Sequence, residues 1–408
     1  MKIFKTFQRG LNFLARQEKT FKTNLLRVST QNFFLSLTQQ FQSLYIVALG
    51  ATPFQLGIVN SVGGLAGAAI ATPIGWLADR HGIRRILLLG TPLMALGALI
   101  FALAPNWMTI IPAILITTLA LRMVMTVCPM VCGRYLKSEE RATGMQLCDT
   151  LSAVPRLIAP VIGSIMVTEF GGINEKGIRP LYYLQVIGLC LILGFVSRQF
   201  TDPYERRPSK ATSSLVDGIR EVLTQGTMVN RWILYISLST IPMCISPVYL
   251  PLFVTEIKHA DQFVLGGIAT ASMVAPLSLS IAIGRLADTI GRKKVIYMTT
   301  PIYCLSLLLL VYAPDSTMLL ASGFLQGFFM LSAVTQGAMA AELVPTHLLG
   351  RWYGLLGLFR GLVSVLAPTI GGVIWSSIGP AYVFFFLIST QFLKMLILTT
   401  IPETLQRH

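Results

Sequence analysis

The sequence predicts an all-α membrane protein built from two similar bundles of six helices. Three observations predict this fold class. First, 54% of the 408 residues are hydrophobic and only 12% are charged, whereas a soluble globular protein carries about 25% charged residues. Second, the apolar residues fall into stretches that are long enough to cross a bilayer. Third, a loop motif in the first half of the chain returns at a constant distance in the second half.

The apolar stretches predict twelve spans, because about 20 mostly apolar residues are needed to cross the hydrocarbon core. The first bundle (28–200) contains spans near 28–49, 55–78, 86–104, 108–133, 142–168 and 180–200. The second bundle (231–402) contains spans near 232–255, 263–287, 295–313, 316–341, 352–376 and 380–401. One long hydrophilic linker, 201–230, divides the bundles, and an apolar stripe within it predicts a short surface helix.

Basic residues predict the orientation of these spans. The chain has 32 Lys and Arg against 17 Asp and Glu, a formal net charge of +15. If both termini are cytoplasmic, most of the basic residues lie on the inner side, and the outer loops hold only Lys176, Arg179 and Lys258. Cytoplasmic loops are enriched in Lys and Arg. We therefore expect a multi-pass protein of the plasma or inner membrane, with a basic N-terminal segment (1–27) and a short C-terminal segment (403–408) in the cytoplasm.

The N-terminal segment admits two interpretations. Its apolar residues recur at helical spacing, which predicts an amphipathic helix on the membrane surface. The alternative is a disordered basic tail. A net positive charge is also typical of nucleic-acid-binding proteins, but the apolar composition excludes that class, and we expect no nucleic-acid partner.

The sequence offers little support for a disulfide framework, a metal site, a catalytic site or a nucleotide-binding loop. The six cysteines lie in apolar runs without a CxxC pair or a nearby His, so we interpret them as free thiols that pack as small hydrophobic side chains. The four His fall at loops or at the C-terminus, and there is no Walker-type loop. The sequence thus predicts no enzyme, no cofactor, no metal and no self-contained ATP-driven pump.

The repeated loop motif is the most specific signal in the chain. Its first copy lies between spans two and three, and its second copy, 209 residues later, lies between spans eight and nine: Gly75-Trp-Leu-Ala-Asp79-Arg80-His-Gly82-Ile83-Arg84-Arg85 and Gly284-Arg-Leu-Ala-Asp288-Thr289-Ile-Gly291-Arg292-Lys293-Lys294. Two further pairs of similar segments occur at nearly the same offset: Arg141-Ala-Thr-Gly144 with Arg351-Trp-Tyr-Gly354, and Ala159-Pro160 with Ala367-Pro368. A constant offset indicates duplication of a six-helix unit in parallel orientation.

These paired loops resemble the signature cytoplasmic loop of the major facilitator superfamily, G-x-L-A-D-R-x-G-R-[KR], and the resemblance covers the whole chain. The first copy departs from that pattern at Ile83 and the second at Thr289. The resemblance implies a secondary transporter whose two bundles rock around a central cavity. It also implies a conformational latch at the cytoplasmic helix ends, formed by Gly75, Asp79, Arg80, Gly82, Arg84, Gly284, Asp288, Gly291, Arg292 and Lys293.

The physical basis of such a latch is simple. An Asp at a helix end can accept hydrogen bonds from basic neighbours and favours the positive N-terminus of an adjacent helix. The alternative is that both loops only set the topology through their positive charge. A separate resemblance lies in span five, where Pro160 and Gly163 are similar to the Pro-Gly element of drug/proton antiporters, with Ser164 replacing one Gly.

Ionisable residues inside the predicted spans are the main functional candidates, because each costs at least a few kcal/mol unless it is compensated. We expect Arg122 to pair with Asp149, so that protonation of Asp149 releases Arg122, while Arg156 remains free for an anionic group of the substrate. The alternative is a buried pair that only sets the helix register. Arg360 either faces the cavity or snorkels to the inner interface, and Lys394 is expected to snorkel.

Span one is rich in amides and hydroxyls, which face lipid only at high cost. We expect Gln39, Gln42 and Tyr45 to line the cavity, with Gln326 and Gln336 facing them from span ten. Span one lacks the acid that many proton-driven multidrug exporters of the superfamily carry there. Arginines outnumber the single aspartate in the interior, which favours an anionic or neutral polar solute.

The sequence therefore predicts a monomeric secondary transporter for a small organic solute, coupled to protons and embedded in the lipid bilayer. Three alternatives remain open: a multidrug/proton antiporter, a facilitator, and a polytopic membrane protein that does not transport.

Overall fold

A computed structural model describes residues 16–81, 83–125, 127–136, 141–200, 227–344 and 349–403. Over these ranges the chain is almost entirely helical and contains no β-strand. The predicted surface helices of the N-terminal segment and of the linker lie largely outside the described residues, as do residues 404–408.

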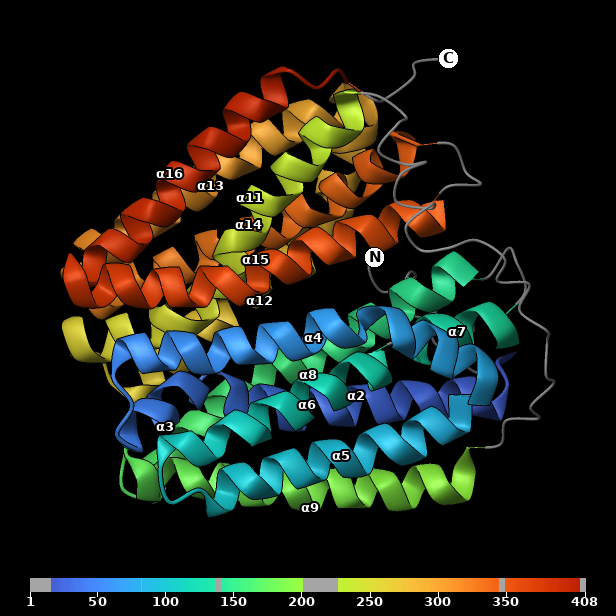
Figure 1. The fold of residues 1–408 in the computed structure, drawn as a ribbon, viewed down its shortest axis with the longest axis vertical. Helices are drawn as coiled ribbons and strands as arrows, with labels where there is room; N and C mark the ends of the chain where they lie inside the picture. The colour runs from blue at the N-terminus through green and yellow to red at the C-terminus, as the bar shows by residue number, and fades with distance from the viewer. Residues whose placement is uncertain are drawn as a thin grey trace, which may run out of the picture.

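The first bundle occupies the lower part of Figure 1. Its helices are α2 (Lys19–Gln39), α3 (Gln42–Ala48), α4 (Pro53–His81), α5 (Ile83–Leu103), α6 (Ile110–Met125), α7 (Val127–Tyr135), α8 (Arg141–Glu169) and α9 (Glu175–Gln199). Predicted span one is divided into two helices, α2 and α3, whereas α6 and α7 both belong to predicted span four. A 3-10 turn at Trp107–Thr109 leads into α6, and the side chain of Asn106 accepts a hydrogen bond from the backbone N–H of Thr109.

The second bundle occupies the upper part of Figure 1. It begins with α11 (Thr227–Leu252), which continues into a π-helical turn, η2 (Phe253–Ile257). The remaining helices are α12 (Gln262–Ile290), α13 (Arg292–Tyr312), α14 (Ser316–Glu342), α15 (Leu349–Ser377) and α16 (Pro380–Thr399). Among the described helical stretches, ten are long and apolar enough to cross a membrane. The other two predicted spans correspond to α2 with α3, whose many polar residues lower its hydropathy, and to α4.

The first helix differs from its prediction. α2 begins at Lys19, nine residues before the predicted start of span one. Arg27, which was expected to lie outside the spans, is inside α2 and only 2% exposed. Its guanidinium donates hydrogen bonds to Asn24 Oδ1 (3.0 Å) and to Gln31 Oε1 (2.7 Å). Each of these hydrogen bonds reaches a residue one helical turn away and stabilises the buried charge of Arg27. Hydropathy alone would place this charge in water.

The loop motif lies where α4 is followed by α5 and where α12 is followed by α13. α4 ends at His81 and α5 begins at Ile83, with Gly82 outside the described residues, and in the second copy Gly291 alone joins α12 to α13. Gly291 has a φ of +109°, a conformation that L-residues with a side chain rarely adopt. Gly291 therefore allows the tight turn between α12 and α13.

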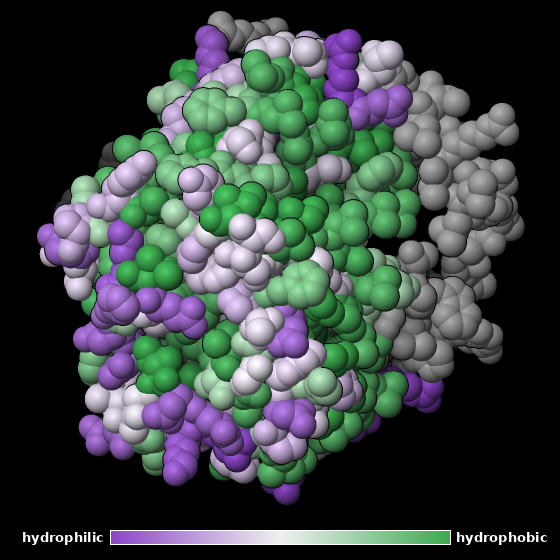
Figure 2. Space-filling view, turned by 60° about the vertical axis from the view of Figure 1, so that its left-hand side comes forward, coloured by the Kyte–Doolittle hydropathy of each residue, from purple (hydrophilic) through white to green (hydrophobic). Residues whose placement is uncertain are grey.

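The two ends of the molecule differ in character. We call the end that carries the α4/α5 and α12/α13 connections the basic end, because Arg84, Arg85, Lys293 and Lys294 lie there. The opposite end, which carries the α3/α4, α5/α6 and α15/α16 connections, is the far end. Figure 2 turns the far end forward and shows hydrophilic residues gathered mainly on its lower part, beside a largely hydrophobic flank.

The two bundles are joined in the half of the molecule nearest the far end. α4 packs against α15, and α8 packs against α12. The hydroxyls of Ser61 and Thr369 lie 2.8 Å apart, and Thr270 donates to the carbonyl of Leu157 at 3.0 Å. A Cβ at Gly64 would collide with the backbone of Ser364, so this glycine allows the two helices to approach closely.

The hydrogen bonds that join the bundles through Ser61, Thr369, Thr270 and Leu157 all lie in this half of the molecule. In Figure 1 the bundles lie together at the left and diverge toward the right, where α7 lies. The structure is therefore closed at the far end and separated at the basic end.

Candidate functional site

A central cavity of about 270 Å³ lies between the bundles. α4 and α6 provide most of its wall, and the second bundle contributes Cys244 of α11 with Ser364 and Pro368 of α15. Its polar lining consists of Gln42, Asn60, Thr117, Thr118, Arg122 and Ser364. The cavity therefore offers hydroxyl and amide groups beside one cation, a set suited to a polar organic solute.

Arg122 lines this cavity, and its side chain is exposed. The absence of a side chain at Gly67 makes room for it, because a Cβ there would lie 3.4 Å from Arg122 Nε. Arg122 thus lines the cavity between the bundles.

A second cavity, of about 280 Å³, lies inside the first bundle between α2, α6, α7 and α8; we call it the side chamber. Arg27 and Arg156 line it together with Gln31, Asn32, Cys128, Cys148 and Ser152. Arg156 is half-buried, and its Nε donates to the carbonyl of Ser152 at 3.3 Å. The rest of the Arg156 guanidinium is available to an acceptor in the chamber.

The two cavities share an electrostatic character. Their charged lining residues, among those that the structure describes, are Arg27, Arg122 and Arg156, and none of the described lining residues is acidic. Cations in a water-poor interior attract anions strongly and also serve as hydrogen-bond donors to neutral acceptors. The arrangement favours solutes that carry a carboxylate, a phosphate or several carbonyl groups.

The three residues of span one that were predicted to line the cavity lie in different surroundings in the structure. Gln42 lines the central cavity, whereas Gln39 is exposed at the end of α2. Tyr45 is fully buried in the core of the first bundle, where its hydroxyl donates to the carbonyl of Phe101 at 2.9 Å and accepts from Arg179 Nε at 3.3 Å. The structure therefore does not place Tyr45 at the cavity wall, because its hydroxyl is already used within the bundle.

The two glutamines of α14 are also engaged inside their own bundle. Gln336 Oε1 accepts from Ser239 at 3.0 Å, and its Nε2 donates to Ser332 at 2.9 Å. Gln326 donates to Ser322 at 3.2 Å. Neither glutamine lines the central cavity or the side chamber, so the facing arrangement expected with span one is not formed in this conformation.

The basic residues of the last two spans, Arg360 and Lys394, differ in how far they are exposed. Arg360 is exposed on α15, one helical turn from Ser364 of the central cavity and toward the basic end. Lys394 was expected to snorkel, and this prediction was wrong: the side chain is 1% exposed, and its Nζ lies 5.9 Å from the ring centroid of Tyr235. The neighbouring helices α11 and α13 enclose this part of α16.

Several predicted residues fall outside what the structure describes. Gly82 is one of them, and so are the side chains of Asp79, Arg80 and Asp149, although their helices α4 and α8 are described. Sequence reasoning in turn missed Arg27, Asn60 and Ser364. The amides Asn24 and Gln31, three and four residues from Arg27, are the signal that could have placed Arg27 inside a helix.

The second copy of the predicted latch forms contacts within its own bundle. Arg292 pairs with Glu342 of α14, and its NH2 lies 4.0 Å from Asp288. Glu403 accepts hydrogen bonds from the backbone N–H groups of Arg292 (3.1 Å) and Lys293 (3.0 Å). The carboxylate of Glu403 thereby caps the N-terminus of α13, where the helix dipole favours a negative charge.

In the first copy, Arg84 donates to the carbonyl of Ser197 on α9 at 3.1 Å, again within one bundle. The contacts named here for Arg84, Arg292 and Lys293 thus each lie within one bundle. This agrees with the separation of the bundles at the basic end, since a latch between them would be released in that state.

Comparisons with known proteins support this arrangement. The family model of the Major Facilitator Superfamily matches residues 26–267 and again residues 232–406. The multidrug resistance protein MdtG of Serratia proteamaculans (strain 568) is 27% identical over 384 residues, covering 86% of this chain and 85% of the relative. MdtG of Proteus mirabilis (strain HI4320) is 25% identical, covering 88% and 90%.

Solved structures share the fold. The nucleoside transporter NupG superimposes with a TM-score of 0.79 at 14% identity, covering 94% of this chain and 99% of the other. A POT family transporter in complex with 5-aminolevulinic acid gives 0.72 at 15% identity, with coverages of 93% and 95%. The human organic anion transporter MFSD10 gives 0.64 at 13% identity, with coverages of 93% and 99%.

Proposed function

Because the chain belongs to the major facilitator superfamily, we propose that it moves a small anionic or neutral polar organic solute across the cell membrane by alternating access. The family and the fold make it a multi-pass secondary transporter. The solute class, the coupling to protons, the orientation and the monomeric state belong to the proposal.

The observation that carries the proposed solute class is the charge of the two cavities. Arg122 in the central cavity and Arg156 in the side chamber present guanidinium groups, and no described lining residue offers a carboxylate to balance them. A permanent cation would meet repulsion at both positions, whereas a carboxylate or phosphate would form charge-assisted hydrogen bonds. An anionic group can bind Arg122 while the polar remainder contacts Asn60 and Thr118.

The proposed transport cycle follows from the closed far end. With the basic end toward the cytoplasm, as the distribution of Lys and Arg predicts, this structure is the inward-facing state. Rocking of the bundles would separate α4 from α15 at Gly64 and bring the two loop motifs together. Asp79, with Arg80 and Arg84, would then form the latch, and Arg292 and Lys293 would form its counterpart in the second bundle.

Proton coupling is proposed to depend on Asp149. Asp149 lies on α8, three residues before Ser152 and seven before Arg156, and both of these line the side chamber. Deprotonated Asp149 would hold Arg122 or Arg156, and protonation would release the arginine to the substrate.

A second candidate is a multidrug/proton antiporter. The similarity to MdtG favours it, and so does the element formed by Pro160, Gly163 and Ser164. In the structure, Ser164 donates to Gln262 of the second bundle at 2.7 Å, which places this element at the junction between the bundles. The two candidates differ in the charge of the solute that they predict.

A flux assay separates them. The purified protein, reconstituted in liposomes with an imposed pH gradient, is offered anionic, neutral polar and permanently cationic solutes. We expect saturable flux of an anionic or neutral solute, reduced at least tenfold by Arg122→Ala and by Arg156→Ala and unchanged by Arg198→Ala, an exposed arginine at the end of α9. Flux of permanent cations alone would support the antiporter and reject the proposed solute class.

The coupling proposal needs its own variant. Asp149→Asn is expected to abolish the response to the pH gradient while the protein still binds the transported solute. If the variant responds to pH as the parent protein does, Asp149 is not the proton carrier.

A further inference from the structure

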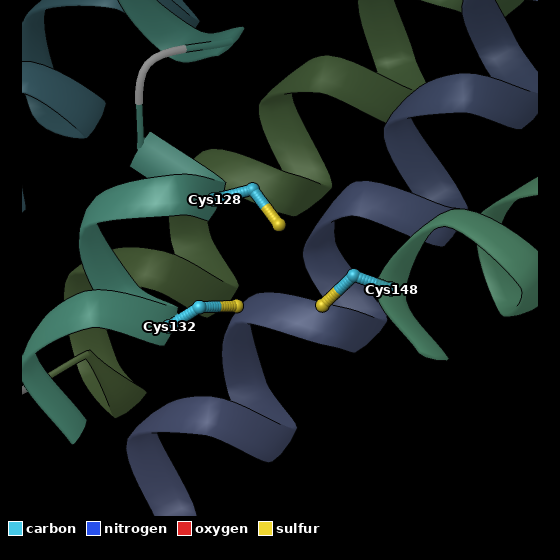
Figure 3. Close-up of side chains that lie close together, drawn as sticks. All are labelled: Cys128, Cys132 and Cys148. Atoms are coloured by element: carbon cyan, nitrogen blue, oxygen red, sulfur yellow. The ribbon is translucent and has the colours of Figure 1, made fainter. Parts of the chain in front are cut away.

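Three of the six cysteines gather at one point of the first bundle. The Sγ atoms of Cys128, Cys132 and Cys148 all lie within 4.8 Å of one another. Cys128 and Cys132 are one turn apart on α7, so they project from the same side of that helix, and Cys148 comes from α8. Figure 3 shows the three thiols directed toward a common centre. None of the six cysteines that the structure describes forms a disulfide.

The cluster is buried but can be reached. Cys132 and Cys148 are buried, and Cys128 is half-buried. Cys128 and Cys148 line the side chamber of about 280 Å³, so a small ion in that chamber would meet two of the thiols directly. The other three cysteines, Cys190, Cys244 and Cys304, are not part of this cluster.

A cation supports the cluster. Arg27 is 2% exposed and lines the same chamber as Cys128 and Cys148. The hydrogen bonds to Asn24 and Gln31 hold its guanidinium in place. Its fixed positive charge can offset a negative charge that thiolate ligands bring to a bound ion.

The donor set is unusual for a metal site in a protein. It contains sulfur alone, since no His, Asp or Glu of the described part of the chain belongs to the cluster. Thiolate donors select soft ions. Structural zinc, by contrast, requires a fourth ligand, which no side chain of this cluster supplies.

We propose that Cys128, Cys132 and Cys148 form a binding site for a thiophilic ion that takes three sulfur ligands, the class that includes Cu(I), Hg(II) and As(III). With metal–sulfur bonds of about 2.3 Å, three sulfurs around one ion lie about 4 Å apart. Thiols already within 4.8 Å of one another need to shift by less than about 1 Å to reach that geometry.

The chemistry balances without a further reactant. Arsenious acid, As(OH)₃, reacts with the three thiols to form three As–S bonds and releases three molecules of water, and no atom is oxidised or reduced. The product, As(III) with three thiolates, is neutral. Hg(II) with three thiolates carries one negative charge, which Arg27 offsets. Both complexes thus avoid a large net charge in the membrane interior.

An ion at this site would also affect the neighbouring polar groups. It would tie α7 to α8 and occupy the wall of the chamber that Arg156 lines. The site does not depend on the proposed transport of an organic solute, and binding can be measured without any transport assay.

The test uses the purified full-length protein with arsenite as the three-coordinate probe. Bound arsenic is measured per chain after gel filtration, and X-ray absorption counts its sulfur neighbours. We expect one arsenic per chain with three sulfur neighbours. Cys128→Ser and Cys148→Ser should each weaken binding at least tenfold, whereas Cys190→Ser and Cys304→Ser should leave it unchanged. Binding that survives Cys148→Ser, or only two sulfur neighbours, would overturn the proposal.

A second measurement needs no variant, so misfolding cannot obscure it. The wild-type protein is alkylated with a maleimide in the presence and absence of arsenite, and the labelled peptides are mapped by mass spectrometry. Arsenite should protect Cys128 and Cys148 and leave the exposed Cys190 reactive. Equal labelling of Cys128 and Cys148 with and without arsenite rejects the site. Tighter binding of Zn(II) than of arsenite rejects its three-coordinate character.

Discussion

The side-chain amide of Gln40 donates a hydrogen bond to the carbonyl of Pro160 at 2.7 Å. The second bundle repeats this contact, because the hydroxyl of Tyr249 donates to the carbonyl of Pro368 at 2.8 Å. Tyr249 follows Gln40 by 209 residues, the offset that separates the loop motifs, and Pro368 follows Pro160 by 208. In each bundle a side chain of the first span therefore holds the fifth span at its proline. The chemical group differs, but the position of the contact is the same in both halves.

Removing the Tyr249 hydroxyl should weaken the closed far end. The oxygen also lies 3.2 Å from the carbonyl of Pro53 in the other bundle. Tyr249→Phe leaves the buried carbonyl of Pro368 without this donor, which costs about 1–3 kcal/mol. We expect a lower melting temperature of the purified protein, whereas Tyr382→Phe, on an exposed side chain, should have no effect. An unchanged melting temperature in Tyr249→Phe would show that the contact contributes nothing.

A larger residue at Gly64 should prevent closure of the far end. A Cβ there would collide with the carbonyl of Ser364, so Gly64→Val requires the bundles to separate. Alkylation of Cys244, which lines the central cavity, reports which side of the membrane reaches that cavity. We expect Gly64→Val to make Cys244 reactive toward a membrane-impermeant maleimide from the far-end side. The matched control is Gly194→Val, where a Cβ meets nothing within 4 Å, and this variant should match the parent.

Lys394 is a buried ammonium with no recorded ion pair to a described acidic residue. Burial of an uncompensated charge costs several kcal/mol, and replacement by an apolar side chain of similar volume often stabilises a protein. We expect Lys394→Met to raise the melting temperature, whereas Lys176→Met, at an exposed position, should leave it unchanged. A lower melting temperature in Lys394→Met would show that the ammonium has a stabilising partner.

The cap of α13 should contribute measurably to stability. Glu403 accepts from the backbone N–H groups of Arg292 and Lys293, and loss of a helix N-cap costs about 0.5–2 kcal/mol. Glu403→Gln keeps the size of the side chain but removes the charge that favours the positive end of the helix. We expect a lower melting temperature than in Glu169→Gln, an exposed carboxylate at the end of α8. Equal melting temperatures in the two variants would argue against the cap.

Local patterns predicted the helices well, and each of the two wrong predictions, the start of α2 and the position of Lys394, has an identifiable physical cause. Hydropathy and punctuation placed the spans, because crossing a bilayer requires a long apolar run whatever the tertiary contacts. The start of α2 was missed because Asn24 and Gln31 neutralise the cost of Arg27 within the helix itself. Snorkelling was expected for Lys394 because its distance from the helix end permits it; the packing of α11 and α13 around α16 excludes it.

Side-chain direction could be predicted only in part. Arg122 and Gln42 line the central cavity, and the rule that polar groups avoid lipid favours such positions. The same rule failed for Tyr45, because a hydroxyl can equally be satisfied by a backbone carbonyl such as that of Phe101. The spacing of Cys128 and Cys132 shows that they share a helix face, but the proximity of Cys148 depends on how α8 is rotated against α7.

The sequence by itself determined the family, the two six-helix bundles and the duplicated loop motif, because apolar length and motif spacing are properties of the chain read in order. The tertiary structure alone decided that the far end is closed, that arginines line both cavities, and that three thiols meet beside Arg27. These features join residues far apart in the chain, and their contact depends on the rotation and tilt of packed helices, which close packing sets to within a few ångströms.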